Sequence, residues 1–248
     1  MQCDPGCEAE RIEQMIRHVL WSSSCAGIVV GVSGGVDSSL AAVLCTAALG
    51  KERVKGVLLP SEVTRKEDIR DARNLCTALG IPAVTVSIQP ILDRYRETPG
   101  YLQNTYLEGN LTARIRMTLL YYLANREYRL VCGTSNRSEY LLGYCTKYGD
   151  NAADFQPILH LYKTEVYALA RHLELPAAIL DKPPSAGLWA GQTDEGELGL
   201  TYPVIDQALR ALESNRWLAS TDEEEKVLRL VESSRHKRSP PFSLLAGS

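Results

Sequence analysis

The chain of 248 residues has no excess of charge of either sign and no long hydrophobic stretch. Its 27 Lys and Arg residues nearly balance 30 Asp and Glu residues, which leaves a net charge of −3. This balance excludes an acidic disordered chain and gives no electrostatic reason to expect binding to nucleic acid or to an anionic membrane. Since no run approaches roughly 18 apolar residues, no transmembrane helix is expected. Any binding of anions must therefore depend on local groups.

The cysteines and the N-terminus point to a reducing compartment. Residues 1–8 lack the basic start and the apolar stretch of a secretory signal. The seven cysteines are scattered, and their odd number excludes a complete set of intramolecular disulfides. Cys3 and Cys7 lie close together, but no second Cys or His pair offers zinc-binding spacing. We therefore expect a cytoplasmic protein with reduced, mostly buried thiols.

The length and composition predict one domain over residues 1–248. A hydrophobic fraction of 45% supports a substantial core, and there are no internal repeats, low-complexity tracts or Ser/Gly linkers. Apolar residues at helical spacing predict a helix over residues 8–20, so residues 1–25 form a helical lead-in.

Short β-branched runs then alternate with helical stretches. Strands are predicted at residues 27–32, 54–59, 83–88 and 129–132, and helices at residues 36–49, 66–79, 107–125 and 163–173. This alternation predicts an α/β, Rossmann-like fold with a doubly wound parallel sheet flanked by helices. The first strand is apolar enough to be buried on both faces. In such sheets, ligands bind beyond the carboxyl ends of the strands, where the strand order reverses.

The turn after the first strand reads Gly31-Val32-Ser33-Gly34-Gly35-Val36-Asp37-Ser38. Its glycines let the backbone approach an anion, and the following helix directs free N–H groups and its positive dipole end at that anion. Ser33 and Ser38 add hydroxyl donors. No Lys follows the glycines as in a Walker A loop, and the spacing does not fit a dinucleotide fingerprint. The turn therefore predicts phosphate binding but does not support hydride transfer.

The Ser-Gly-Gly-x-Asp-Ser core of this turn resembles the signature of ATP pyrophosphatases. This resemblance implies an adenine nucleotide alpha hydrolase-like fold that binds the pyrophosphate of ATP and forms adenylates. A carboxylate inside a phosphate site is unfavourable without a cation, which predicts that Asp37 is a Mg²⁺ ligand bridging to phosphate oxygens. The alternative is that Asp37 merely begins the helix after the turn.

Four segments farther along the chain narrow this resemblance. They are Asn110–Met117, Gly133–Glu139, Lys147–Asp150 and His236–Arg238. In this order they resemble ammonia-dependent NAD synthetases over residues 27–240. The resemblance implies that ATP adenylates the nicotinate carboxylate of deamido-NAD and that ammonia then displaces AMP. It also implies Mg²⁺ as a cofactor and a homodimer.

The resemblance assigns further contacts with ATP and Mg²⁺. Thr134, Lys163 and Ser185 are expected to contact ATP, and Glu139 is expected to be the second protein ligand of Mg²⁺. Lys163 opens a helix, where a cation opposes the dipole, so its position needs another reason. For Glu139 the alternative is a solvated acid that the dipole favours in a first helical turn.

The resemblance assigns deamido-NAD contacts to Arg114, Lys147, Asp154, His236 and Lys237. Without the resemblance, the alternative for Arg114 is a role in a surface salt bridge. The alternative for the basic residues at 235–238 is that they end a helix that begins near Asp222. The helix dipole alone favours acidic residues at the start of a helix and basic residues at its end. Both alternatives stay open from the residues themselves.

The helix over residues 107–125 is apolar on more than one side. One stripe consists of Leu107, Leu111, Ile115, Leu119 and Tyr122. Arg114 is expected at its edge, facing an anionic substrate, while Arg116 points farther away. Further apolar residues around the helix predict burial in the core or in a subunit interface.

Residues 182–202 form a glycine-rich stretch that is long for a compact domain. We predict a lid that would protect an acyl adenylate from water, with disorder as the alternative. The roughly 25 residues before the first strand cannot hold an amidase domain, so free ammonia or a separate supplying protein is expected as the nitrogen source.

Two other functions fit the glycine turn. A tRNA-thiolating pyrophosphatase would be favoured by zinc-ribbon cysteines and a basic surface, neither of which is visible. A non-catalytic nucleotide-binding regulator would not need the carboxylate pair of Asp37 and Glu139, and the fold itself does not discriminate.

Overall fold

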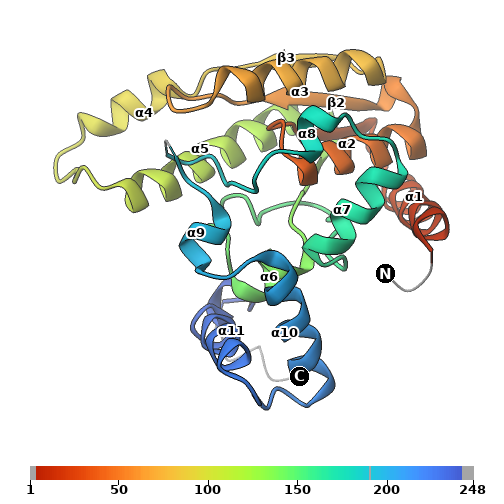
Figure 1. The fold of residues 1–248 in the computed structure, drawn as a ribbon. Helices are drawn as coiled ribbons and strands as arrows, with labels where there is room; N and C mark the ends of the chain where they lie inside the picture. Colours follow the sequence, from red (N-terminus) through yellow and green to blue (C-terminus); the bar gives the residue numbers. More distant parts are fainter. Residues whose placement is uncertain (1–3, 190, 242–248) are drawn as a thin grey trace.

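The computed structural model describes residues 4–189 and 191–241. These residues form a parallel sheet flanked by helices (Figure 1). Within these residues the sheet has four strands, β1 (Gly27–Gly31), β2 (Val54–Leu58), β3 (Ala83–Thr85) and β4 (Arg129–Cys132). Their order is β3-β2-β1-β4, and every pairing is parallel. This arrangement confirms the predicted α/β fold with helices on both faces of a parallel sheet.

The predicted helices are present with small differences in length. They are α1 (Pro5–Ser23), α2 (Val36–Leu49), α3 (Lys66–Leu79), α5 (Thr105–Arg126), α7 (Lys163–His172) and α11 (Asp222–Ser233). The remaining elements are α4 (Gln89–Arg96), α6 (Arg137–Leu142), α8 (Ala177–Leu180), α9 (Asp194–Leu198), α10 (Tyr202–Ser214), η1 (Lys51–Arg53) and η2 (Arg235–Lys237). Because α11 ends at Ser233, the predicted helix extending through residues 235–238 was too long.

Strand β1 is covered on both faces, as its sequence predicts. Ile28 and Val30 face a core shared with α1, α2, α3 and α7, while Val29 faces the opposite side, where α5 packs. Because α2 and α3 cover one face and α5 covers the other, the direction of the crossovers reverses between β1 and β4. The segments that follow these two strands therefore meet at the switch point of the sheet.

The C-terminal helices α10 and α11 lie at the end of the molecule away from α3 and α4 (Figure 1). They pack with α6 around a second apolar cluster that includes Leu142, Leu209 and Val227. From η2, Lys237 donates to the carbonyls of Gly143 and Cys145, both at 2.7 Å. These carbonyls follow the C-terminal end of α6, where helix carbonyls lack internal partners. The end of the short helix α6 is thus held in place by η2.

Helix α5 is buried on one side, and it also leaves large apolar side chains exposed near both of its ends. Ile115 is 5% exposed, whereas Leu107 and Tyr122 are 50% and 62% exposed. Tyr106, next to Leu107, is 63% exposed. The apolar stripe predicted for this helix is therefore only partly used within one chain.

The cysteines of the described part of the chain carry free thiols. Cys45, Cys76 and Cys132 are buried, while Cys7 is exposed. Cys3, the neighbour of Cys7 in the sequence, lies outside the described residues. Among the helices in the described ranges, none combines the length and the apolar character needed to span a bilayer.

Candidate active site

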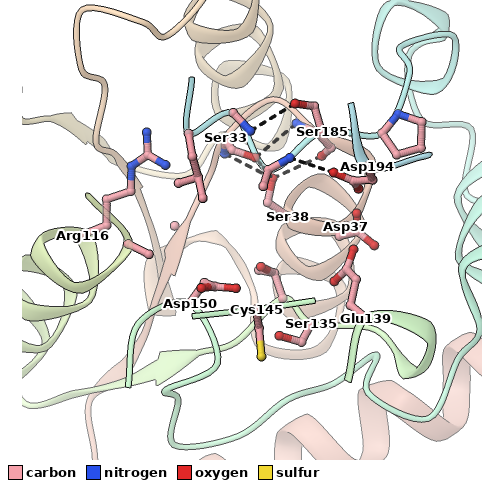
Figure 2. A pocket seen from close by; sticks show the side chains of 18 of the residues that line it. Ser33, Asp37, Ser38, Arg116, Ser135, Glu139, Cys145, Asp150, Ser185 and Asp194 are labelled. Carbon is pink, nitrogen blue, oxygen red and sulfur yellow. Dashed lines mark hydrogen bonds between the residues drawn. The ribbon is translucent and has the colours of Figure 1, made fainter. Parts of the chain in front are cut away.

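A cavity of about 520 Å³ opens at the carboxyl ends of β1 and β4. Its walls come from the glycine turn, the end of β2, the middle of α5, the start of α6, the 143–152 segment and the 182–197 segment. This size lies within the range of roughly 300 to 1,000 Å³ that is usual for small-molecule sites. Figure 2 shows acidic and hydroxyl side chains that point into it from several of these elements.

The glycine turn is held by its own serine hydroxyls. Ser38 Oγ accepts from the Ser33 amide at 3.1 Å and lies 3.0 Å from Ser33 Oγ. The Gly35 amide donates to Ser33 Oγ at 3.3 Å. Gly34 has φ +83°, and a Cβ there would lie 2.5 Å from the Asp68 carbonyl oxygen. This position therefore requires glycine for both its backbone conformation and its packing.

The residues expected to contact ATP nearly all meet in this cavity. Those that line it are Gly31, Val32, Ser33, Gly35, Val36, Asp37, Ser38, Thr134, Lys163 and Ser185. Gly34 packs against the start of α3 instead. The structure thus brings the turn after β1 together with Thr134 after β4 and with Ser185 of the glycine-rich stretch.

The two predicted metal ligands share one cation in this structure. Lys163 Nζ lies 2.6 Å from Asp37 Oδ2 and 3.0 Å from Glu139 Oε1, and its side chain is 2% exposed. Lys163 is the first residue of α7, and its side chain reaches from there to both carboxylates. This explains a cation at a helix start, since the carboxylates offset the unfavourable dipole.

Asn136 connects the same two acids. Its Nδ2 donates to Asp37 Oδ1 at 2.8 Å, while its Oδ1 accepts from the Glu139 amide at 3.0 Å. Asn136 and Glu139 form a capping box at the start of α6. Glu139 therefore lies in the first turn of a helix, as the alternative expected, but its carboxylate is largely buried beside Lys163 and is not solvated. Asn136 is a positioning residue that the sequence analysis did not single out, although the spacing from Asn136 to Glu139 signals such a box.

Three carboxyl groups, those of Asp37, Glu139 and Asp194, lie around the ammonium of Lys163. Burial lowers the pKa of its ammonium, but Asp37 and Glu139 more than offset this effect, so that the net shift is upward. Burial raises the pKa of Glu139 to about 8, Lys163 opposes that shift, and Asp37 and Asp194 add to it. Burial likewise raises the pKa of Asp194. Three carboxyl groups thus surround one ammonium, and a further cation close to Glu139 would favour its ionised form.

Asp37 and Glu139 are the carboxylates of this cluster that suit a divalent cation. Asp194 is occupied otherwise, because its carboxylate accepts from the Ala186 amide and the Tyr202 hydroxyl, both at 3.0 Å. In the described ranges no group of three or more His, Cys, Asp or Glu side chains has an arrangement suited to a metal. Two carboxylates do fit the way Mg²⁺ binds with nucleotides, where phosphates and waters supply the other ligands.

Most residues predicted to contact deamido-NAD lie outside the cavity. Arg114 donates to the Lys147 carbonyl at 3.3 Å, and Lys147 Nζ donates to the His236 carbonyl at 2.6 Å. These three residues form one connected group on the surface. Lys237 lines the cavity, but its ammonium is used by the carbonyls after α6. Asp154 lies apart from them and accepts from the Val131 amide at 2.7 Å.

The predicted orientation of the two arginines on α5 was wrong. Arg116 lines the cavity and donates from Nε to the Leu59 carbonyl at 3.1 Å, whereas Arg114 does not line it. Burial lowers the pKa of Arg116 to about 10, although Asp150 opposes the shift. Since β2 ends just before Leu59, Arg116 anchors the end of a neighbouring strand, a contact between distant segments that helical periodicity does not reveal.

The glycine-rich stretch has defined structure over residues 182–189 and 191–202. Ser185 Oγ donates to the Gln192 carbonyl at 2.8 Å, and the Leu188 amide donates to Gln192 Oε1 at 2.7 Å. Helix α9 lies in the same stretch, and Ser185, Leu188 and Gln192 line the cavity. The stretch therefore covers one side of the cavity, in the position that a lid requires.

A family model described as NAD synthase matches residues 8–241. The chain belongs to the NAD synthase family. An NH(3)-dependent NAD(+) synthetase from Methanoregula boonei is 58% identical over 97% of this chain and 97% of its own length. Two solved structures match almost completely. The NMN synthetase from Francisella tularensis has a TM-score of 0.90 and 36% identity, covering 97% of this chain and 98% of its own. The NH3-dependent NAD synthetase from Campylobacter jejuni, in complex with the nitrate ion, has a TM-score of 0.85 and 36% identity, covering 98% and 100%.

Membership of the NAD synthase family makes the chain an enzyme of the ligase class. It argues against both alternatives that the glycine turn left open, because neither a tRNA-thiolating enzyme nor a non-catalytic regulator belongs to this class. The neighbours also share the parallel sheet flanked by helices. The neighbour from Francisella tularensis is named for NMN, and the neighbour from Campylobacter jejuni is named for NAD.

Proposed function

We propose that the enzyme uses ATP and Mg²⁺ to amidate deamido-NAD with ammonia, giving NAD, AMP and pyrophosphate through an acyl adenylate. The observation that carries this proposal is the cavity at the switch point, where the glycine turn meets Asp37, Glu139 and Lys163. The relative at 58% identity is named for NAD, which favours deamido-NAD over the mononucleotide.

In the first step an oxygen of the nicotinate carboxylate attacks the α-phosphorus of ATP, and the bond to pyrophosphate breaks. The glycine turn and the start of α2 supply N–H groups and hydroxyls to the departing pyrophosphate. Thr134 and Ser185 enter the same cavity and are proposed to hold the ATP in line. In the second step the nitrogen of ammonia attacks the acyl carbon, AMP leaves with the electrons of the broken C–O bond, and the nitrogen releases a proton to give the amide. Catalysis therefore depends mainly on position and electrostatics.

Asp37 and Glu139 would hold Mg²⁺, which would neutralise charge that builds up on the phosphates. Lys163 can then turn its ammonium from the carboxylates to a phosphate, since all three groups line one cavity. The surface group of Arg114, Lys147 and His236 lies just outside and carries cationic side chains suited to the phosphates of a dinucleotide. Residues 182–202 would cover the adenylate and exclude water.

Incubation with ATP, MgCl₂, ammonium and deamido-NAD should produce NAD and AMP in equal amounts. The coupled measurement of both products by chromatography tests the adenylation and the acceptor together, because an adenylate route releases AMP and not ADP. A parallel reaction with nicotinate mononucleotide as the acceptor should be at least about 10-fold slower.

Each alternative has its own result in this assay. Formation of ADP would contradict the adenylate. Faster amidation of the mononucleotide would reassign the acceptor while leaving the reaction type in place. Reactions without ammonium, or with glutamine instead, are the controls for the nitrogen source, and both should form no NAD.

We also propose that the enzyme is a homodimer formed through α5, whose exposed apolar residues include Tyr106, Leu107 and Tyr122. Light scattering should give about twice the mass of 27.4 kDa expected for one chain. Leu107→Lys should shift the mass toward one chain. Leu218→Lys is the matched control, because Leu218 is 64% exposed on the segment between α10 and α11. A single-chain mass for the wild type would refute the dimer.

A further inference from the structure

Lys182 begins the glycine-rich stretch, and its ammonium lies against the phosphate turn. Its Nζ is 3.2 Å from the Gly34 carbonyl oxygen, 2.9 Å from Asp68 Oδ1 and 2.6 Å from Asp71 Oδ2. The side chain is 17% exposed and lines the cavity. The turn lacks a lysine in its own sequence, yet this ammonium reaches it from a residue 148 positions farther along the chain.

The two acids that hold Lys182 are also paired with arginines. Arg65 donates to Asp68 through Nε at 2.8 Å and through a terminal nitrogen at 3.1 Å. Arg70 Nε donates to Asp71 at 3.2 Å. The hydrogen bond from Lys182 is the main reason that the pKa of Asp71 is lowered, so this acid is ionised at neutral pH. Arg65 and Arg70 thus share the two carboxylates with Lys182, so Lys182 is not the sole cation on either acid.

The two cavity lysines therefore differ in their surroundings. Lys163 is enclosed by the carboxyl groups of Asp37, Glu139 and Asp194, whereas Lys182 shares its two carboxylates with Arg65 and Arg70. The contact between Lys182 and the Gly34 carbonyl is the longest of its three and joins it to a neutral group. That contact is the one that a phosphate oxygen can replace while the carboxylates keep the ammonium in position.

We propose that Lys182 binds the β- and γ-phosphates of ATP, and with them the departing pyrophosphate, from the side of the glycine-rich stretch. This proposal rests on the proposed function, in which ATP is the co-substrate. The same contact would tie the first residue of the stretch to the phosphates. ATP bound at the glycine turn would thus favour the arrangement in which the glycine-rich stretch covers the cavity.

Titration calorimetry with ATP, pyrophosphate and AMP tests this role, because AMP lacks the two distal phosphates. Lys182→Met should weaken the binding of ATP and pyrophosphate about 10- to 100-fold, the loss expected for a charge-assisted contact, and should leave AMP within about 2-fold. Lys182→Arg should recover most of the affinity for pyrophosphate, because it keeps the charge. Unchanged affinity for ATP and pyrophosphate would overturn the proposal, as would an equal loss for AMP, which indicates a purely structural tie.

Two further variants keep the test decisive. Lys226→Met is the matched control, because Lys226 Nζ donates at 2.9 Å to the carbonyl of Gly199 at the other end of the stretch. It should leave the affinities for all three ligands unchanged. If Lys182→Met fails to fold because Asp71 loses a partner, Lys182→Met with Asp71→Asn restores the charge balance and should show the same selective loss. None of these measurements needs an acceptor, so they separate this proposal from the identity of the amidated substrate.

Discussion

Asp37→Asn should lower the rate of NAD formation by at least about 100-fold, the scale of losing one preorganised electrostatic group. In the structure one Asp37 oxygen accepts from Lys163 at 2.6 Å and the other accepts from Asn136 at 2.8 Å. Asparagine keeps the shape but offers one acceptor oxygen to these two donors. It also removes a negative charge from a cluster that depends on carboxylates to hold a cation beside the phosphates.

The fold should survive this substitution, because Asp37 lies at the edge of the cavity with 18% exposure. Circular dichroism and the thermal midpoint check the fold, and steady-state NAD formation checks the rate. Asp93→Asn is the matched control, since Asp93 pairs with Arg96 on the surface and is 51% exposed. It should leave the rate unchanged. A rate for Asp37→Asn within about 3-fold of the wild type would contradict the proposed role, because this is far below the expected loss.

The framework of the fold could be predicted because its signals are local. Strand β1 is a short β-branched run, and α2 and α3 end before Gly50 and Gly80, so their predicted bounds agree with the structure. The short helices α8 and α9 were not predicted, because four or five residues carry too little periodicity. The prediction wrongly extended α11 through the basic residues 235–238. The helix ends earlier, and Lys237 donates to two carbonyls after α6 and not to the end of its own helix.

The candidate site likewise has parts that the sequence predicts and parts that it does not. Motif and topology together predicted that the turn after β1 and the residues after β4 would meet, because parallel strands present their carboxyl ends at one edge. The contacts of Lys182 with Asp68 and Asp71, and of Arg116 with the Leu59 carbonyl, join segments that are distant in the sequence. Neither has a local pattern that would reveal it. A net charge of −3 also gives no indication that three carboxyl groups gather around Lys163.

Lys163→Met should make the folded protein depend on Mg²⁺. This variant leaves Asp37, Glu139 and Asp194 around an apolar side chain, and removal of one partner from a buried charge cluster costs about 3 to 5 kcal/mol of the free energy of unfolding. In the wild type the ammonium already occupies the space between Asp37 and Glu139, so Mg²⁺ without ATP should add little stability. In the variant both carboxyl groups are open to the metal, and MgCl₂, which binds their ionised forms, should restore much of the lost stability.

Urea unfolding at neutral pH, with MgCl₂ or with NaCl at equal ionic strength, measures this difference without any turnover. Lys163→Met combined with Glu139→Gln is the control, because it removes one of the two carboxylates and should abolish most of the gain from Mg²⁺. An equal gain for the wild type and for Lys163→Met would show that Lys163 does not compete with the metal for these carboxylates. The predicted difference would instead mean that ATP must draw Lys163 toward its phosphates before Mg²⁺ can bind to Asp37 and Glu139, so that nucleotide and metal enter the site together.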